Sequence, residues 1–189
     1  KIKKKETAED GSTKTYVINV TVKELNPVEV TIGKKKYTIV RKEDENITIP
    51  SNYEKSTITI GKEEVLCYKN SKTKNILVLL KDEKGNTKLY SYNEKTKKYT
   101  IYNSLSVGDI TFNIIDMPSN LVPKGYSKVS FTYDNSKLEG YQLREKNKTY
   151  AADDKVKGSD FYLFYAINEK TGEKALYVYD KLEGTIQRF

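Results

Sequence analysis

Tyrosine is the main candidate for ligand binding in this chain, with 16 copies in 189 residues. Tyr90 and Tyr92 alternate along one expected strand, and Tyr177 and Tyr179 do the same 87 residues later. Alternate residues of a strand project from one face, so each pair places two rings side by side. Exposed rings would stack on sugars or anchor a protein partner, whereas buried rings would pack a core. Because the pair recurs, we favour packing.

The other candidate ligand-contacting residues lie in or near one segment, 145–159. They are Tyr150, Asp153, Asp154 and Tyr162. Asp153 and Asp154 form one of the two best oxygen clusters for calcium, but no calcium-loop spacing accompanies them. No glycine-rich phosphate loop is present either. The sequence therefore predicts no metal and no cofactor.

Catalytic chemistry is restricted by the absence of histidine, the commonest general base and metal ligand. This excludes Ser-His-Asp and Cys-His catalysis and histidine-rich zinc sites. A glycosidase-type carboxylate pair stays open, although the acidic residues mostly border turns, where they satisfy backbone groups. Cys67 is the single cysteine, and Gly140 replaces it in the repeat described below, which indicates a small buried scaffold position. We predict a protein that is not an enzyme.

The net charge of +8 is distributed unevenly. Residues 23–103 carry 17 basic and 11 acidic side chains, whereas residues 104–189 carry 12 of each. Only three basic residues are arginine, the residue favoured for bidentate phosphate contacts. A duplicated phosphate-binding groove would keep its charge in both copies, so we expect no nucleic-acid partner.

The chain contains the same sequence pattern twice. The segment 31–40 recurs 75 residues on, the segments around Tyr53 and Tyr68 recur at a spacing of 73, and residues 85–92 recur at 87. Such an ordered series indicates two copies of one unit. We assign them to residues 23–103 and 104–189. Fourteen extra residues in the second copy are expected within Glu145–Ser159.

Strand signals follow one another without helical periodicity, so the fold class is all-β. Ile76–Leu80 is apolar on both faces and predicts a central strand, whereas Tyr16–Val22 alternates and predicts a half-buried one. We expect two tandem antiparallel units of about five or six strands each. They would form two small barrels or a pseudo-symmetric sandwich. No stretch approaches the length of a membrane span, so we expect no insertion of this segment.

The amino-terminal residues Ala8-Glu9-Asp10-Gly11, followed by Thr13–Val22, resemble the last hairpin of a bacterial cadherin-like β-sandwich domain. The resemblance implies that residues 1–22 are the remnant strand of a preceding sandwich. The tail Tyr177–Phe189 resembles the end of an uncharacterised module that follows such sandwiches in surface proteins of low-GC Gram-positive bacteria. These resemblances imply an extracellular location, with attachment to the cell surface through parts of the protein beyond these residues.

The expected function is that of a non-catalytic extracellular module with a spacer or adhesion role. The alternatives are a carbohydrate-binding or cell-wall glycan-binding module that uses exposed tyrosines, and a glycan-active enzyme. The partner is unknown, with a cell-wall glycan or another surface protein as the candidates.

Overall fold

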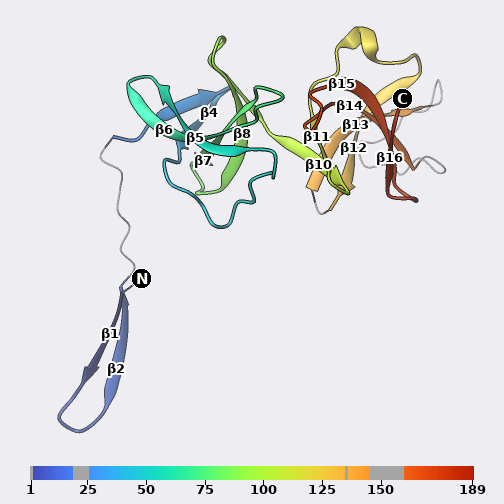
Figure 1. The fold of residues 1–189 in the computed structure, drawn as a ribbon. Coiled ribbons are helices and arrows are strands. Elements are labelled where there is room, and N and C mark those ends of the chain that lie inside the picture. Colours follow the sequence, from blue (N-terminus) through green and yellow to red (C-terminus); the bar gives the residue numbers. More distant parts are fainter. Residues whose placement is uncertain (1, 19–25, 135, 145–159) are drawn as a thin grey trace.

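The computed structural model describes residues 2–18, 26–134, 136–144 and 160–189. The regular structure of these residues consists of antiparallel strands and one short 3-10 turn, Ser119–Leu121. The strands form one two-stranded sheet and two seven-stranded sheets (Figure 1). The all-β class and the two related units are thus confirmed. No helix in the described ranges is long and apolar enough to cross a membrane.

The first seven-stranded sheet, here called unit 1, takes in every strand predicted for the first copy. Its strands are β3 (Glu29–Ile32), β4 (Lys35–Ile39), β5 (Glu54–Ile60), β6 (Glu63–Lys69), β7 (Ile76–Asp82), β8 (Thr87–Asn93) and β9 (Lys98–Ile101).

The second sheet, unit 2, repeats the same order of pairing. Its strands are β10 (Asn103–Val107), β11 (Ile110–Ile114), β12 (Tyr126–Tyr133), β13 (Ser136–Leu143), β14 (Phe161–Asn168), β15 (Lys174–Asp180) and β16 (Thr185–Arg188). Each sheet is therefore larger than the five or six strands expected, because all seven segments join it.

The central strand β7 explains how one sheet encloses a core. One edge pairs with β8, while the other pairs with β6 at Ile76–Leu77 and with β4 at Leu80–Asp82. The sheet therefore divides into two branches. Both branches contribute to one core, which includes Ile39 from β4 and Ile58 from β5. Neither unit is a closed barrel, because β5 does not pair with β9 in unit 1 and β12 does not pair with β16 in unit 2.

β7 is buried on both faces, as its apolar sequence predicts. Val78 and Leu80 join the main core of unit 1. Leu77 and Leu79 join a second cluster on the opposite face, together with Tyr53, Leu66 and Tyr68. This second cluster bears on the contact between the units, because Tyr53 also reaches unit 2.

The pairing register shows where the two copies differ in length. Tyr68 pairs with Leu77 in unit 1 and Tyr141 pairs with Leu163 in unit 2, which gives a spacing of 86 on the central strand. The returning strands β8 and β15 keep the spacing of 87. Thirteen of the 14 extra residues therefore precede β14, and the remaining one lies in the β14–β15 hairpin. The prediction that placed all of them within 145–159, outside the described residues, was wrong by this one residue.

Cys67 is a buried scaffold position, as expected. At the equivalent Gly140, a Cβ atom would lie 2.9 Å from the Leu163 carbonyl oxygen and 3.0 Å from the Phe131 ring. Phe131 stands where unit 1 has the smaller Ile58, so its ring occupies the space that the cysteine side chain fills in unit 1.

The amino-terminal hairpin, β1 (Ile2–Thr7) and β2 (Thr13–Ile18), pairs with neither unit. Tyr16 and Val17 are exposed, so the half-buried strand predicted from their alternation is not observed at these two positions. The predicted continuation to Val22 lies outside the described residues.

Candidate functional site

The four paired tyrosines are core residues. Tyr90, Tyr92, Tyr177 and Tyr179 are each only 5–7% exposed. The first two belong to the main core of unit 1 and the others to the core of unit 2. Each pair projects from one face as predicted, but that face is buried. The exposed platform required for sugar binding is therefore absent at these tyrosines.

Of the remaining candidates, Tyr162 alone lies within the described residues. Tyr162 is half-buried and stacks on Phe131, with ring centroids 4.7 Å apart. Tyr150, Asp153 and Asp154 lie outside the described residues. Within the described ranges, no three histidine, cysteine or acidic side chains come together as metal ligands would.

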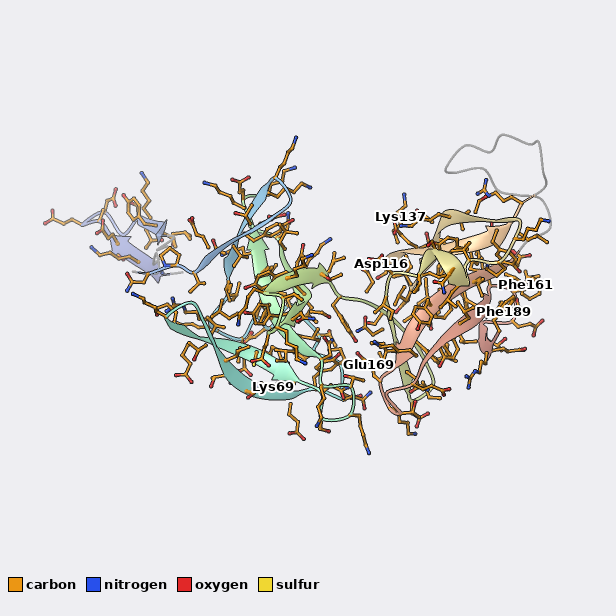
Figure 2. All side chains as sticks on the ribbon, turned by 90° about the horizontal axis from the view of Figure 1, so that it is seen from above. Lys69, Asp116, Lys137, Phe161, Glu169 and Phe189 are labelled. Carbon is orange, nitrogen blue, oxygen red and sulfur yellow. The ribbon has the colours of Figure 1, made fainter. Side chains whose placement is uncertain are left out.

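The structure instead brings together residues from both units around Glu169, in the β14–β15 hairpin of unit 2. Tyr53 Oη donates a hydrogen bond to Glu169 Oε1 at 2.5 Å, and Tyr102 Oη donates to Glu169 Oε2 at 3.0 Å. Glu169 is 1% exposed. Figure 2 shows it on the side of unit 2 that faces unit 1. A carboxylate of one unit is thus held by two hydroxyl groups of the other.

Amide side chains of unit 1 fix this arrangement. Asn75 Nδ2 donates to Tyr53 Oη at 2.9 Å and to Ser91 Oγ at 3.0 Å. Because Tyr53 Oη accepts from Asn75, its own proton is directed to Glu169. Asn70 Nδ2 lies 3.4 Å from the Glu169 carbonyl oxygen. We call Tyr53, Asn70, Asn75 and Tyr102 the receptor.

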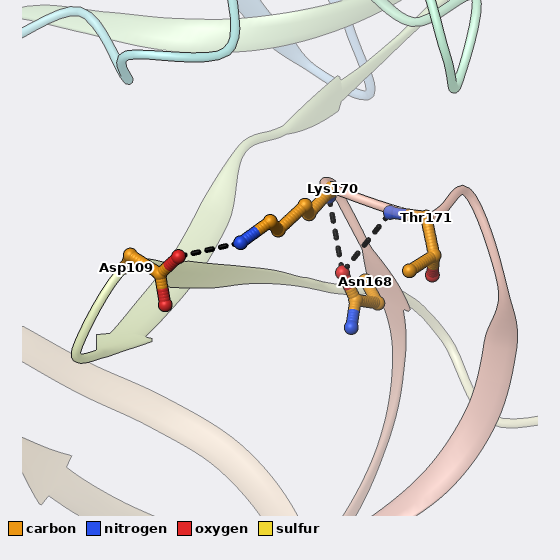
Figure 3. Close-up of polar contacts among 4 residues, drawn as sticks. All are labelled: Asp109, Asn168, Lys170 and Thr171. Atoms are coloured by element: carbon orange, nitrogen blue, oxygen red, sulfur yellow. Dashed lines mark hydrogen bonds and ion pairs between the residues drawn. The ribbon is translucent and has the colours of Figure 1, made fainter.

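Hydrogen bonds and a glycine in the β14–β15 turn position Glu169 against the receptor. Asn168 Oδ1 accepts hydrogen bonds from the backbone N–H groups of Lys170 and Thr171, as drawn in Figure 3. Gly172 completes the loop at φ +81°, a conformation that glycine adopts without strain. Lys170 Nζ forms an ion pair with Asp109 at 2.5 Å. The lysine next to Glu169 therefore neutralises a different carboxylate.

The receptor face contains a loop of the same kind. Asn70 Oδ1 accepts from the N–H groups of Lys72 and Thr73, as Asn168 does in its own loop. The two loops meet, since a Cβ atom on Gly172 would lie 3.6 Å from the Lys72 carbonyl oxygen. The contact therefore involves backbone packing in addition to side-chain hydrogen bonds.

Burial dominates the electrostatics of the site. It raises the pKa of Glu169 above the ordinary 4.5, because desolvation outweighs the two tyrosine hydrogen bonds that favour the charged form. Burial also raises the pKa of Tyr53 and of Tyr102, and the negative charge of Glu169 adds to both effects. No hydrogen bond or ion pair in the described chain joins Glu169 to a cation. The arrangement holds two surfaces together and presents no nucleophile.

The equivalent face of unit 2 has lost this chemistry. Tyr126 and Phe189 keep the edge-to-face ring geometry of Tyr53 and Tyr102, with centroid separations of 6.2 and 6.0 Å. The other polar receptor positions, Asn70 and Asn75, correspond to Leu143 and Phe161 by the register. Figure 2 shows Phe161 and Phe189 on the side of unit 2 away from unit 1. A complete receptor is therefore present in unit 1 alone.

Glu169 does not stand out in the sequence, because its neighbours are charged and turn-forming, which is typical of an exposed hairpin tip. The available signal was the length of that hairpin, since the β7–β8 hairpin has one residue fewer. Comparisons of the chain with protein-family models, with curated proteins and with solved structures find no match. What the fold and the site define is an all-β protein of two related units joined through a buried polar contact.

Proposed function

We propose that this chain is a non-catalytic spacer module of an extracellular bacterial surface protein. The observation that supports the proposal is the buried contact of Glu169 with Tyr53 and Tyr102. A spacer must transmit orientation as well as length, and the hydrogen bonds from Tyr53 and Tyr102 to Glu169 hold the two units against each other. The covalent connection is short as well, because β9 ends at Ile101 and β10 begins at Asn103.

The extracellular location rests on the resemblance of the amino-terminal hairpin and of the tail to parts of bacterial surface proteins. It is tested by treating intact cells of the source bacterium with a protease and measuring whether this segment is cleaved. Protection in intact cells, with cleavage after lysis, would contradict a surface location.

The spacer role is tested by the distance between two spin labels, one on each unit. Lys55 and Lys137 are exposed and suit labelling after replacement by cysteine in a Cys67→Ala background. We expect one narrow distance distribution for this doubly labelled chain and a broad one after Glu169→Ala. A broad distribution before Glu169 is changed would refute the role. Glu173→Gln, in the same hairpin but exposed, is the matched control.

A further inference from the structure

A groove of about 930 Å³ runs along the boundary between the two units. Unit 1 contributes the loop before β7 together with parts of β8 and β9, and unit 2 contributes parts of β11, β13 and β14. Its volume is within the usual range of small-molecule sites, roughly 300–1,000 Å³. Its walls come from both units, so the contact at Glu169 also sets the shape of the groove.

Asn113 on β11 is a polar side chain of the groove wall that the fold does not use. It is only 5% exposed, yet its amide makes no hydrogen bond with any residue that the structure describes. Its neighbours are accounted for, since Phe112 enters the core and Thr111 Oγ1 bonds to Ser106 Oγ. Its amide is not among the fully enclosed polar groups that lack a partner, so its polar atoms keep contact with solvent in the groove. The Asn113 amide can offer a ligand both a donor and an acceptor.

Two half-buried rings, Tyr141 and Tyr165, line the same groove. Their equivalents in unit 1 are Tyr68 and Leu79, which are buried in the second apolar cluster. In unit 2 this face is less closed, partly because the position of Leu66 is taken by Glu139. That carboxylate is exposed and pairs with Lys128 at 2.6 Å. The groove therefore lies where unit 1 has a closed second core.

The groove wall has mixed chemistry. Alongside the rings and Asn113 it includes the amide of Asn75 and the hydroxyl groups of Ser91 and Thr100. Five lysines, Lys74, Lys95, Lys98, Lys128 and Lys174, outnumber the acidic Glu94, Asp116 and Glu139 that also line it. Tyrosine rings suit the C–H faces of sugars, and amides and hydroxyls suit their hydroxyl groups. The lysine excess favours acidic substituents.

We propose that this groove binds an oligosaccharide. Tyr141 and Tyr165 stack on sugar rings, and the Asn113 amide hydrogen-bonds to a sugar hydroxyl. The proposal shares with the spacer role the contact between the units, but a binding site does not require that the chain transmit orientation to neighbouring domains. It also differs from the sugar-binding alternative considered for the sequence, whose paired tyrosines are buried.

The test is a backbone amide NMR titration of the full 189-residue chain. The probes are the tetrasaccharides of N-acetylglucosamine, of β-1,4-linked glucose and of galacturonic acid, which cover N-acetylated, neutral and acidic sugars. We expect at least one probe to shift the signals of Asn113, Tyr141 and Tyr165. The proposal is overturned if none causes shifts up to roughly 10 mM, well above the roughly 1 mM Kd of a weak site.

Variants distinguish binding in this groove from binding at other surfaces. Tyr165→Ala and Asn113→Leu should each weaken binding by about five- to tenfold, which is the expected loss of one ring or amide contact. Tyr16→Ala, which removes an exposed ring on the amino-terminal hairpin, should leave binding unchanged. If Asn113→Leu fails to fold, Tyr165→Leu keeps a side chain of similar bulk without the ring. Unchanged affinity in folded groove variants, or shifts confined to another surface, would overturn the proposal.

Discussion

Replacement of Glu169 by alanine should loosen the connection between the units and lower the free energy of unfolding. The change removes both acceptors and leaves the hydroxyls of Tyr53 and Tyr102 without their partner. An unsatisfied buried hydroxyl costs about 1–3 kcal/mol. Water entering the vacated space offsets part of this cost, so we expect the free energy of unfolding to fall by about 2–4 kcal/mol.

Glu169→Gln is the finer perturbation because it keeps the shape of the side chain. Its amide oxygen can accept from one tyrosine, but its NH₂ group faces the other hydroxyl, which must then turn to accept. The variant loses a charge-assisted bond and is also relieved of burying a charge. We expect a net loss of about 1 kcal/mol near neutral pH.

The native chain and Glu169→Gln should differ in how their stability depends on pH. The sign of the difference follows from the raised pKa of Glu169. Stability from a group whose pKa is raised on folding is fully present below its unfolded value, here 4.5, and is lost as pH rises through the folded value. Glutamine does not titrate. The stability of the native chain relative to Glu169→Gln should therefore fall as pH rises above 4.5, because only the native chain acquires the buried charge.

The assay is urea unfolding at a series of pH values, followed by tyrosine fluorescence, since the chain has no tryptophan. Glu173→Gln is the control, because it removes an exposed carboxylate from the same hairpin. Its profile should run nearly parallel to that of the native chain. If the Glu169→Gln profile is also parallel, the buried carboxylate does not titrate as inferred, and the account of the contact fails.

Three further perturbations test the packing and the turns. Gly140→Ala should lower the free energy of unfolding by about 1–3 kcal/mol in urea titrations, because its Cβ meets backbone and the Phe131 ring; adding Phe131→Leu should restore part of the loss. Lys97→Gly should raise the free energy of unfolding by about 0.5 kcal/mol, since Lys97 has φ +58°; a thermal midpoint that falls would contradict the assigned strain. The raised pKa of Tyr53 and of Tyr102 predicts stability lost above about pH 10; an ultraviolet titration should show both protonated until the chain unfolds, and early ionisation would argue against their burial.

Local sequence patterns predict the strands well, because each unit is built from short apolar or alternating runs between turns. The apolar run at Ile76–Leu80 indicates a strand covered on both faces, and both faces of β7 are buried. The repeat also identifies scaffold positions, since Cys67 and the paired tyrosines recur as small or aromatic core residues. These predictions succeed because the relevant forces act within one strand or between equivalent strands.

The contact at Glu169 could not be predicted in the same way, because its chemistry depends on three distant parts of the chain. Tyr53 is 116 residues away from Glu169, and Tyr102 is 67 residues away. Local sequence favours solvent for a glutamate in a charged hairpin. Only the relative placement of the units overrides that preference, and hydrophobic periodicity does not encode it. Likewise, the burial of Asn113 depends on how β11 sits against its neighbours.

Unit 2 supplies the hairpin and unit 1 supplies the receptor at this contact, and the asymmetry limits how many units can join. Contacts between like units that use two different surfaces can repeat without end and give open fibres. Here the loop of the β7–β8 hairpin is one residue shorter and begins at Asp82 where unit 2 has Asn168, while the receptor positions of unit 2 are largely apolar. Unit 1 has a glutamate at the position of Glu169, namely Glu83, but the complete receptor of each chain is already filled by that chain's own Glu169, and unit 2 has no complete receptor to take another. The two units therefore form a closed pair, which cannot extend into a fibre through the contact at Glu169.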